Sequence, residues 1–469
     1  MKRGWMAISV LLLGCGSKSG LLSPDGVASV GSGGGTSSGG AGGSGGAGGS
    51  AGSPSGGTGG TLEQQCVLSP MGEASELLSF PEGDADTPMM VVLDAGSSSK
   101  NAKVAYGAIS EDANFWHPEL RIAELSLSPS AATLSKPPVL YGFDAHAWGR
   151  MAPAVGNAPG VALAFLHSDE ANPNVTPGFH FRSFDPSSWS PGPEVNVDGD
   201  GTVAYDLVPG ASDYAVCYRG ILPGSAAEPR VAILAKDGKL KAGPLAASFS
   251  TAYPGSSCDL AWTGQSYLVA TSIAECDPLE DPCAPFRVQV QRLGAQGQLT
   301  QTAEVLPLVA GELPRRSVIA SNGTATWMAW SEAAADPSDA PRTVRMVRLD
   351  ATGAQLGEPI VLATDAHPSH AVSIDVGAYG VVVWWGEPGD PGLPESAPGS
   401  ARMVVHHFSG AGEPLQEPLL LPATAFAYGL PPSFAALDPA LGALLSWGGR
   451  ATAGSDVTWL ARLACIDEP

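Results

Sequence analysis

The sequence is poor in basic residues, and it has no apolar run long enough to span a membrane. Lysine and arginine total 24 against 46 aspartates and glutamates, which gives a formal net charge of -22 over 469 residues. Because phosphate binding needs clustered basic side chains, we expect no nucleic-acid partner. No apolar stretch approaches the roughly 18 residues of a transmembrane helix, and helical periodicity and helix caps are absent too. These absences predict an acidic protein built from strands, with 44% hydrophobic residues to form its core.

The first 15 residues have the layout of an export signal. Lys2 and Arg3 are positively charged, residues 6–13 form a short apolar segment, and Leu12-Leu13-Gly14-Cys15 completes the pattern. This stretch resembles a bacterial lipobox, in which a signal peptidase cuts before a lipidated cysteine. The resemblance implies that residues 1–14 are a signal peptide and that Cys15 anchors the mature chain to a membrane of the cell envelope. Gly16 is not Asp, which in many Gram-negative lipoproteins implies the outer membrane.

A long tether follows the lipobox. Residues 31–60 are almost entirely Gly, Ser, Ala and Thr. Such a segment cannot bury enough apolar area to offset its ordering entropy, so residues 15–61 are predicted to be a disordered linker. A Gly-rich coil over residues 16–61 has a mean end-to-end distance of roughly 35 to 40 Å. The linker would hold a folded domain, residues 62–469, clear of the lipid headgroups.

A unit of four short strands recurs from residue 89 onward. The second strands of seven copies are predicted at 104–106, 161–165, 214–218, 267–270, 327–330, 381–385 and 444–447. The third strands are predicted at 120–125, 179–184, 230–234, 286–293, 343–349, 403–408 and 457–463. Many short strands at even spacing indicate an all-β fold, either a β-propeller or a sandwich.

The two ends of the folded region favour the propeller. The seventh copy stops after its third strand, and an apolar strand at 75–80 precedes the first copy without a partner of its own. Pairing of these terminal strands would close a ring and remove an open edge. The pattern therefore resembles a seven-bladed β-propeller of no identified family. The closure would bring Cys66 and Cys465 together, and a disulfide between them would add several kcal/mol, roughly, by the chain-entropy estimate.

The remaining cysteines leave more than one interpretation. With Cys15 assigned to lipid, six cysteines remain, an even number that favours disulfides in an exported chain. Cys276 and Cys283 are seven apart in a Pro-rich and acidic loop, which favours a loop-closing disulfide over a metal site. Cys217 and Cys258 lie on predicted strands of neighbouring copies. They are either a disulfide that links two copies or two buried free thiols.

Calcium is the one cofactor that the sequence leaves open. Asn196, Asp198 and Asp200, followed by Gly201, match the opening half of a calcium loop. The bidentate carboxylate expected at the twelfth position is missing, because Leu207 stands there. Asp-Gly repeats are also ordinary turn sequence, so a plain turn is the favoured interpretation.

Histidines and aromatic residues give further candidates. His367 and His370 form one cluster, which Asp365 could complete as a metal site, whereas His406 and His407 should point to opposite faces of a strand. We expect the strand tryptophans to fill the core between sheets. These are Trp262, Trp327, Trp330, Trp384, Trp385 and Trp447. Loop residues 115–117 and Trp189 are the expected ligand contacts, since binding commonly resides on loops of a rigid scaffold.

No nucleophile, base and orienting group stand out at any spacing. We therefore expect a monomeric, lipid-anchored scaffold that binds a protein or a glycan and is not an enzyme. The alternative is a hydrolase or lyase acting on polysaccharide, with acidic side chains that converge at the central channel of the propeller. Carboxylates grouped with a basic or aromatic residue at one mouth of that channel would favour the alternative.

Overall fold

The computed structural model consists of strands joined by turns. It describes residues 66–70, 75–79, 90–94, 101–111, 116–128, 131–134, 139–142, 147–153, 161–167, 178–184, 191–220, 228–246, 258–273, 287–294, 297–305, 312–334, 341–368, 372–377, 379–424, 426, 433–436, 443–450 and 456–467. None of these residues is in an α-helix, and among them no helix could cross a membrane. The prediction of an all-β fold is confirmed for this part of the chain.

The described strands form seven antiparallel sheets, which we number in chain order. Sheet one contains β3 (Met90–Asp94), β4 (Asn101–Glu111), β5 (Trp116–Ser128), β6 (Ala131–Leu134) and β7 (Val139–Gly142). Sheet two contains β8 (Ala147–Pro153), β9 (Val161–His167), β10 (Gly178–Phe184) and β11 (Val195–Asp198). Sheet three contains β12 (Gly201–Pro209), β13 (Asp213–Gly220), β14 (Glu228–Ala235) and β15 (Leu240–Ala246). Sheet four contains β16 (Cys258–Trp262), β17 (Tyr267–Ile273), β18 (Arg287–Leu293) and β19 (Leu299–Val305).

The last three sheets repeat the plan. Sheet five contains β20 (Glu312–Ser321), β21 (Thr326–Ala334), β22 (Arg342–Leu349) and β23 (Gln355–Ala366). Sheet six contains β24 (Ser373–Gly377), β25 (Gly380–Pro388), β26 (Ala401–Phe408) and β27 (Leu419–Ala423). Sheet seven contains β28 (Ser433–Ala436), β29 (Ala443–Arg450) and β30 (Asp456–Asp467), together with β1 (Cys66–Pro70) and β2 (Ser75–Ser79). Every predicted second and third strand coincides with a strand of the structure.

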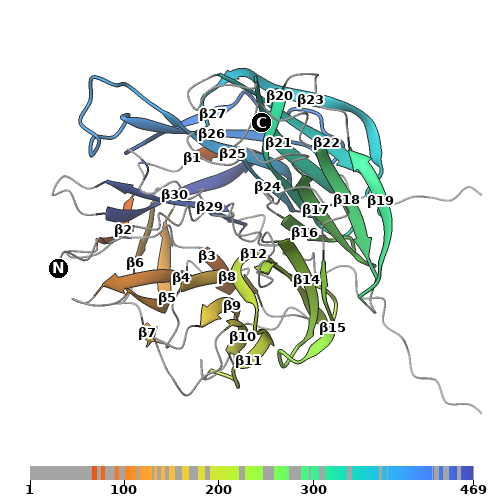
Figure 1. The fold of residues 1–469 in the computed structure, drawn as a ribbon. Coiled ribbons are helices and arrows are strands. Elements are labelled where there is room, and N and C mark those ends of the chain that lie inside the picture. Colours follow the sequence, from red (N-terminus) through yellow and green to blue (C-terminus); the bar gives the residue numbers. More distant parts are fainter. Residues whose placement is uncertain are drawn as a thin grey trace, which may run out of the picture.

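Consecutive sheets pack against each other. The first strands of sheets one to six lie beside one another in chain order, and β28 lies beside β3. In Figure 1 the colours accordingly run around the molecule from orange through green to blue. Shared apolar cores join sheets three to seven in sequence, and sheets two and three share another.

The position of a strand within its sheet explains its composition. All residues of β25 except the last are buried, because a second strand is covered by neighbouring sheets on both faces. Its run of valines and tryptophans fits that setting, since β-branched and aromatic side chains pack well on a pleated surface. The fourth strand β23 has only one buried residue, at its end, because it lies at the outer edge.

Two buried aspartates link first strands to each other. Asp206 on β12 accepts a hydrogen bond from the backbone N–H of Leu260 on β16, at 2.7 Å. Asp259 on β16 accepts one from the backbone N–H of Ile319 on β20, at 2.6 Å. Both carboxylates are almost fully buried. Each therefore satisfies a backbone donor that the next sheet would otherwise leave unpaired.

A disulfide also crosses between two sheets. Cys217 on β13 and Cys258 on β16 are bonded, with their Cα atoms 6.2 Å apart. Of the two interpretations of this pair, the disulfide is confirmed. It closes a loop with a sequence separation of 41 residues, which by the chain-entropy estimate contributes about 4 kcal/mol.

The N-terminal strands pair with the C-terminal strand. Both β1 and β2 are antiparallel to β30, and Figure 1 shows β1 against it. On its other side, β1 is held by Gln416, whose amide accepts from the N–H of Leu68 at 2.7 Å and donates to its carbonyl at 2.9 Å. The register places Cys66 opposite Asp467 and Leu68 opposite Cys465. Because the side chains of Cys66 and Cys465 lie outside the described residues, their disulfide stays a prediction.

Replacing Asp259 tests the bond between first strands. Asp259→Ala leaves the buried N–H of Ile319 without its acceptor, so we expect the free energy of unfolding to fall by about 1–3 kcal/mol. Asp259→Asn retains an acceptor oxygen and should lose less. Urea denaturation followed by tryptophan fluorescence measures both. Equal losses in the two variants would contradict a role for the hydrogen bond.

Candidate ligand pocket between sheets six and seven

Sheets five and six share an arrangement of tryptophan, glutamate and arginine. In sheet five, Trp330 Nε1 donates to Glu332 Oε1, and Arg345 Nε donates to Glu332 Oε2 at 3.1 Å. Sheet six repeats it with Trp385, whose Nε1 donates to Glu387 at 2.7 Å. Arg402 closes that group with an ion pair to Glu387 at 2.7 Å. Both glutamates are buried, so each binds its tryptophan's only donor while its charge is paired with an arginine.

Sheet seven breaks this arrangement. Trp447 packs toward sheet six, as Trp385 packs toward sheet five. Two residues further on, where sheets five and six have glutamate, sheet seven has Gly449. Across the ladder from Trp447 stands Trp459, where Trp330 of sheet five faces Arg345 and Trp385 of sheet six faces Val404. Relative to sheet five, an acidic and a basic side chain are thus replaced by a glycine and a second indole.

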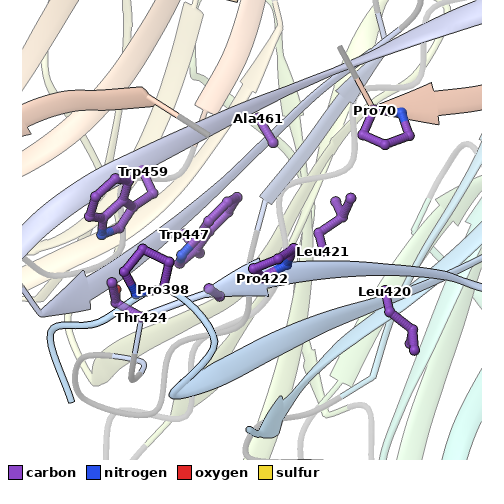
Figure 2. Close-up of a pocket in the computed structure, with 10 residues that line it drawn as sticks. Pro70, Pro398, Leu420, Leu421, Pro422, Thr424, Trp447, Trp459 and Ala461 are labelled. Atoms are coloured by element: carbon purple, nitrogen blue, oxygen red, sulfur yellow. The ribbon is translucent and has the colours of Figure 1, made fainter. Parts of the chain in front are cut away.

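A pocket occupies this part of the boundary between sheets six and seven. It has a volume of about 450 Å³, within the range of small-ligand sites. Its floor is buried and includes Leu421, Ala423, Thr424 and Trp447. Its rim carries exposed apolar residues: Pro70 from β1, Pro398, Pro422 and Leu420. Figure 2 shows the two indoles grouped with Pro398 and Thr424 at one end, and Pro70 and Leu420 at the other.

Three polar atoms of the pocket lack a hydrogen-bond partner among the described residues. They are Trp447 Nε1, Trp459 Nε1 and Thr424 Oγ1, all buried from solvent. A Cβ atom placed on Gly449 would collide with Thr424 Oγ1 and would lie 3.0 Å from Trp459 Nε1. Because Gly449 has no side chain, Thr424 Oγ1 and Trp459 Nε1 can both lie close to its Cα atom. Other buried polar atoms of the described residues, such as Trp327 Nε1, also lack a partner, but these three stand out because they lie around one pocket. Buried polar atoms without a partner are costly, so this grouping makes the pocket a candidate ligand site.

The pocket is neutral although the chain is acidic. None of the ten described residues that line it carries a charge. Leu420 is 58% exposed, the largest exposed fraction among the large apolar side chains described. Exposed apolar surface of this kind marks interaction sites when it adjoins a built pocket. A ligand for this site is therefore held by apolar contact and by hydrogen bonds rather than by ion pairs.

The two histidines of β26 point to opposite sides of sheet six, as their alternation predicts. His406 stacks on Trp385 with ring centroids 5.0 Å apart. His407 Nε2 lies 2.8 Å from the carbonyl oxygen of Tyr379. Burial lowers the pKa of His406 to about 4, against a smaller opposing effect of Glu387. Burial also lowers the pKa of His407. Both rings are core residues on separate faces, so they do not share a metal ion.

The predicted calcium residues are held in other interactions. Asp198 Oδ2 accepts from Arg230 at 2.7 Å and from the hydroxyl of Tyr218 at 2.9 Å. Burial and the nearby Asp198 raise the pKa of Tyr218, which keeps its hydroxyl protonated as a donor. The amide of Asn196 lies 3.2 Å from His180, and Asp200 bonds Asp198 only through its backbone N–H. Within the described part of the chain, no group of three metal-binding side chains occurs. This arrangement favours the turn.

Several other candidates lie outside the described residues. They are Cys15, Cys276, Cys283, His370, Phe115 and Trp189. Only the backbone is described for Trp116 and His117. His367 and Asp365 are described and exposed.

The first strands carry the carboxylates that a polysaccharide-cleaving site would need. Asp206 and Asp259 each bond a backbone N–H of the next sheet, as described above. Asp375 on β24 accepts from the hydroxyl of Tyr379. Each of these three carboxylates is thus engaged in a hydrogen bond within the fold.

Sequence reasoning missed the residues that make the pocket. It assigned Trp447 to the core, and Trp447 is indeed buried, but the expectation overlooked its unpaired indole. Trp459, Thr424 and Gly449 were not candidates at all. One signal was present: aligned on the tryptophan, sheets five and six read Trp-x-Glu, whereas sheet seven reads Trp-x-Gly.

Comparisons with known proteins leave the chain without a family. No family model matches it, and no curated protein sequence matches it. Among solved structures, it is similar to an acylaminoacyl peptidase from Pyrococcus horikoshii, with 9% identity, a TM-score of 0.43, and coverage of 81% of this chain and 52% of the peptidase. The chain thus spans about half of that protein.

Two further solved structures are similar at the same level. The β-propeller domain of the Trilobed protease from Pyrococcus furiosus has 10% identity, a TM-score of 0.42, and coverage of 80% of this chain and 94% of that one. An α-L-arabinofuranosidase from Fusarium graminearum has 9% identity, a TM-score of 0.41, and coverage of 84% and 98%. Likeness this weak assigns no activity, so function must be argued from the pocket itself.

The pKa of His406 makes a stability prediction. In the unfolded chain a histidine titrates near pH 6.5, whereas folded His406 stays neutral down to about pH 4. Between these values the unfolded state binds the extra proton, so stability is complete above about pH 6.5 and falls as the pH drops. One such group costs up to about 1.4 kcal/mol per pH unit. His406→Phe, which keeps a flat ring against Trp385, should reduce this slope.

Chemical denaturation at pH 8, 7, 6 and 5 measures the effect. Above pH 7 the wild type and His406→Phe should show the same pH dependence, which serves as the internal control. Identical slopes for the two proteins between pH 6.5 and pH 5 would contradict burial of a neutral His406.

Proposed function

We propose that this chain is a lipid-anchored envelope protein that binds a ligand in the pocket between sheets six and seven. The observation that carries the proposal is the set of three unpaired polar atoms on Trp447, Trp459 and Thr424 around one pocket with an exposed apolar rim. A ligand with hydrogen-bond acceptors would satisfy donors that the fold leaves unpaired. It would also cover Leu420 and the rim prolines, which gives apolar contact.

The proposal includes a seven-bladed β-propeller as the scaffold. Each sheet would be one blade, with its first strand near the axis and its fourth strand outside. Support comes from the side-by-side order of the first strands and from the pairing of β1 and β2 with β30. In this arrangement the terminal strands close the ring, and the pocket lies at the closing seam because Pro70 of β1 lines it. A rigid ring would keep the two walls of the pocket at a fixed separation.

The anchor is the second part of the proposal. Cys15 would carry the lipid, and residues 16–61 would form a leash to the folded domain, at the outer membrane. The Cys217–Cys258 disulfide supports an exported location, because disulfides persist in oxidising compartments. With no basic cluster in the sequence, the lipid rather than surface charge would hold the protein to a membrane.

Cys15→Ser tests the anchor. Without a thiol the lipid cannot be attached, so we expect the protein to move from the membrane fraction to the soluble fraction, as immunoblots of separated fractions would show. Cys217→Ala with Cys258→Ala is the matched control, which removes a disulfide but leaves the lipobox intact. Continued membrane association of Cys15→Ser would refute the anchor.

Photocrosslinking in cells tests the pocket. A benzophenone amino acid in place of Leu420 should form a covalent adduct with the ligand or its carrier, because Leu420 is at the rim. The same group at Leu240 is the control, since Leu240 is 43% exposed but lies on β15 of sheet three. The adduct should disappear when Gly449→Glu and Thr424→Ala fill the pocket.

An equal yield of adducts at positions 420 and 240 would contradict the proposal. So would an adduct at position 420 that persists after the pocket is filled. Thermal denaturation of the filled variant verifies that the domain still folds.

A further inference from the structure

The hydrogen-bonding groups of the pocket restrict the chemistry of its ligand. The two indoles can only donate, and Thr424 supplies one hydroxyl that can donate or accept. The described lining contains no carboxylate, no amide side chain and no imidazole. A matching ligand must therefore offer acceptors, and it must bring few donors of its own.

Two classes of ligand combine apolar faces with acceptor oxygens. A glycan stacks on indole rings, but each of its hydroxyls also carries a proton that needs an acceptor, and among the lining side chains only the Thr424 hydroxyl can accept. A proline-rich peptide has the opposite balance. Its imide units have a carbonyl acceptor and no N–H, and the polyproline II conformation turns those carbonyls outward.

We infer that the pocket binds a proline-rich segment of a partner protein in the polyproline II conformation. This inference rests on the proposed ligand site. The two indole N–H groups are buried in the unbound structure, so a small rotation of the indoles would let them donate to carbonyls of the segment, and its proline rings would pack against the indole faces. This combination is how aromatic grooves recognise such segments. The exposed rim residues Pro70, Pro422 and Leu420 would extend the apolar contact beyond the pocket.

Charge supports the same ligand. The chain carries a net charge of -22, yet the pocket has no charged lining residue. An acidic ligand would be repelled by the protein as a whole, and a basic one would find no carboxylate in the pocket. A proline-rich segment is neutral, and its stiffness lowers the entropy lost when it binds.

The other sheets show how the pocket can be closed. In sheets five and six a glutamate takes the tryptophan donor and an arginine pairs with the glutamate. Gly449→Glu with Thr424→Ala would install the missing acceptor. The second change removes the hydroxyl that would collide with the new Cβ atom, and the ring of Trp459, whose Cδ1 would lie 2.9 Å from that atom, would have to shift. The added side chain would take the donor of Trp447 and fill the pocket.

Indole signals in nuclear magnetic resonance report on the donors directly. The sample is the full chain with Cys15→Ser, labelled with ¹⁵N at tryptophan, and the probe is decaproline. We expect decaproline to shift the indole N–H signals of Trp447 and Trp459 and to leave that of Trp330 in place. Trp447→Phe assigns its signal and should weaken binding by about three- to tenfold, through loss of one hydrogen bond. Trp330→Phe is the matched control and should bind as the parent does, because its indole N–H is already bonded to Glu332.

The filled variant and a second probe decide between the proposals. Loss of decaproline binding in Gly449→Glu with Thr424→Ala, at unchanged circular dichroism, supports the inference. Chitohexaose is the glycan probe. If it shifts the two signals and decaproline does not, the ligand class is wrong while the ligand site stands. If neither probe shifts them, both the inference and the ligand site are overturned.

Discussion

Face-to-face packing of each sheet against its neighbours is the constraint on which the rest of this structure depends. A strand such as β25 is buried on both faces, so any polar group it presents to the next sheet is removed from water. In several places an acidic side chain accepts the hydrogen bond that such a buried donor needs. Asp206 and Asp259 accept backbone N–H groups of the following sheet, and Glu332 and Glu387 accept indole N–H groups. At the described interfaces between sheets three and six these four donors are each met by an acidic side chain, whereas some other buried polar atoms there, such as Trp327 Nε1, have no partner.

Sheet seven departs from the arrangement of sheets five and six at Gly449, where two indoles and a hydroxyl without partners among the described residues meet at one pocket. The loss of a glutamate at Gly449 would be expected to leave a small cavity and an unpaired donor. The structure instead has a second indole and a hydroxyl beside the first, and all three are unpaired. A neutral mutation in one copy of the repeat would remove a stabilising side chain. It would not also place two further polar atoms, Trp459 Nε1 and Thr424 Oγ1, beside the empty position. Natural proteins break local rules of packing mainly at functional sites, where the lost stability is the condition for binding.

The repeat could be predicted from the sequence, whereas the site could not. Second and third strands such as 381–385 and 403–408 can be recognised from local runs of β-branched and aromatic residues. These runs reflect burial of the strands between neighbouring copies of the repeat. The Cys217–Cys258 disulfide was one of two interpretations, because pairing depends on how two sheets are turned toward each other. The pocket depends even more on tertiary packing, because its residues come from two sheets: Thr424 follows β27 of sheet six, whereas Trp447 and Trp459 belong to sheet seven. Whether an indole N–H has a hydrogen-bond acceptor depends on how sheets six and seven pack together, so no single segment of the sequence reveals it.

The pocket lies where the N-terminal strand β1 meets sheets six and seven. Its walls come from β27 of sheet six and from β29 and β30 of sheet seven, and β1 contributes Pro70 at the rim. Gln416 holds β1 from the side of sheet six while β30 holds it from the other. The strand β1 therefore contacts the same boundary that forms the pocket. If the chain is anchored through Cys15 as proposed, a pull on the anchor would reach β1 before the rest of the described sheets, and the two hydrogen bonds of Gln416 to Leu68 would help to keep the walls of the pocket in place.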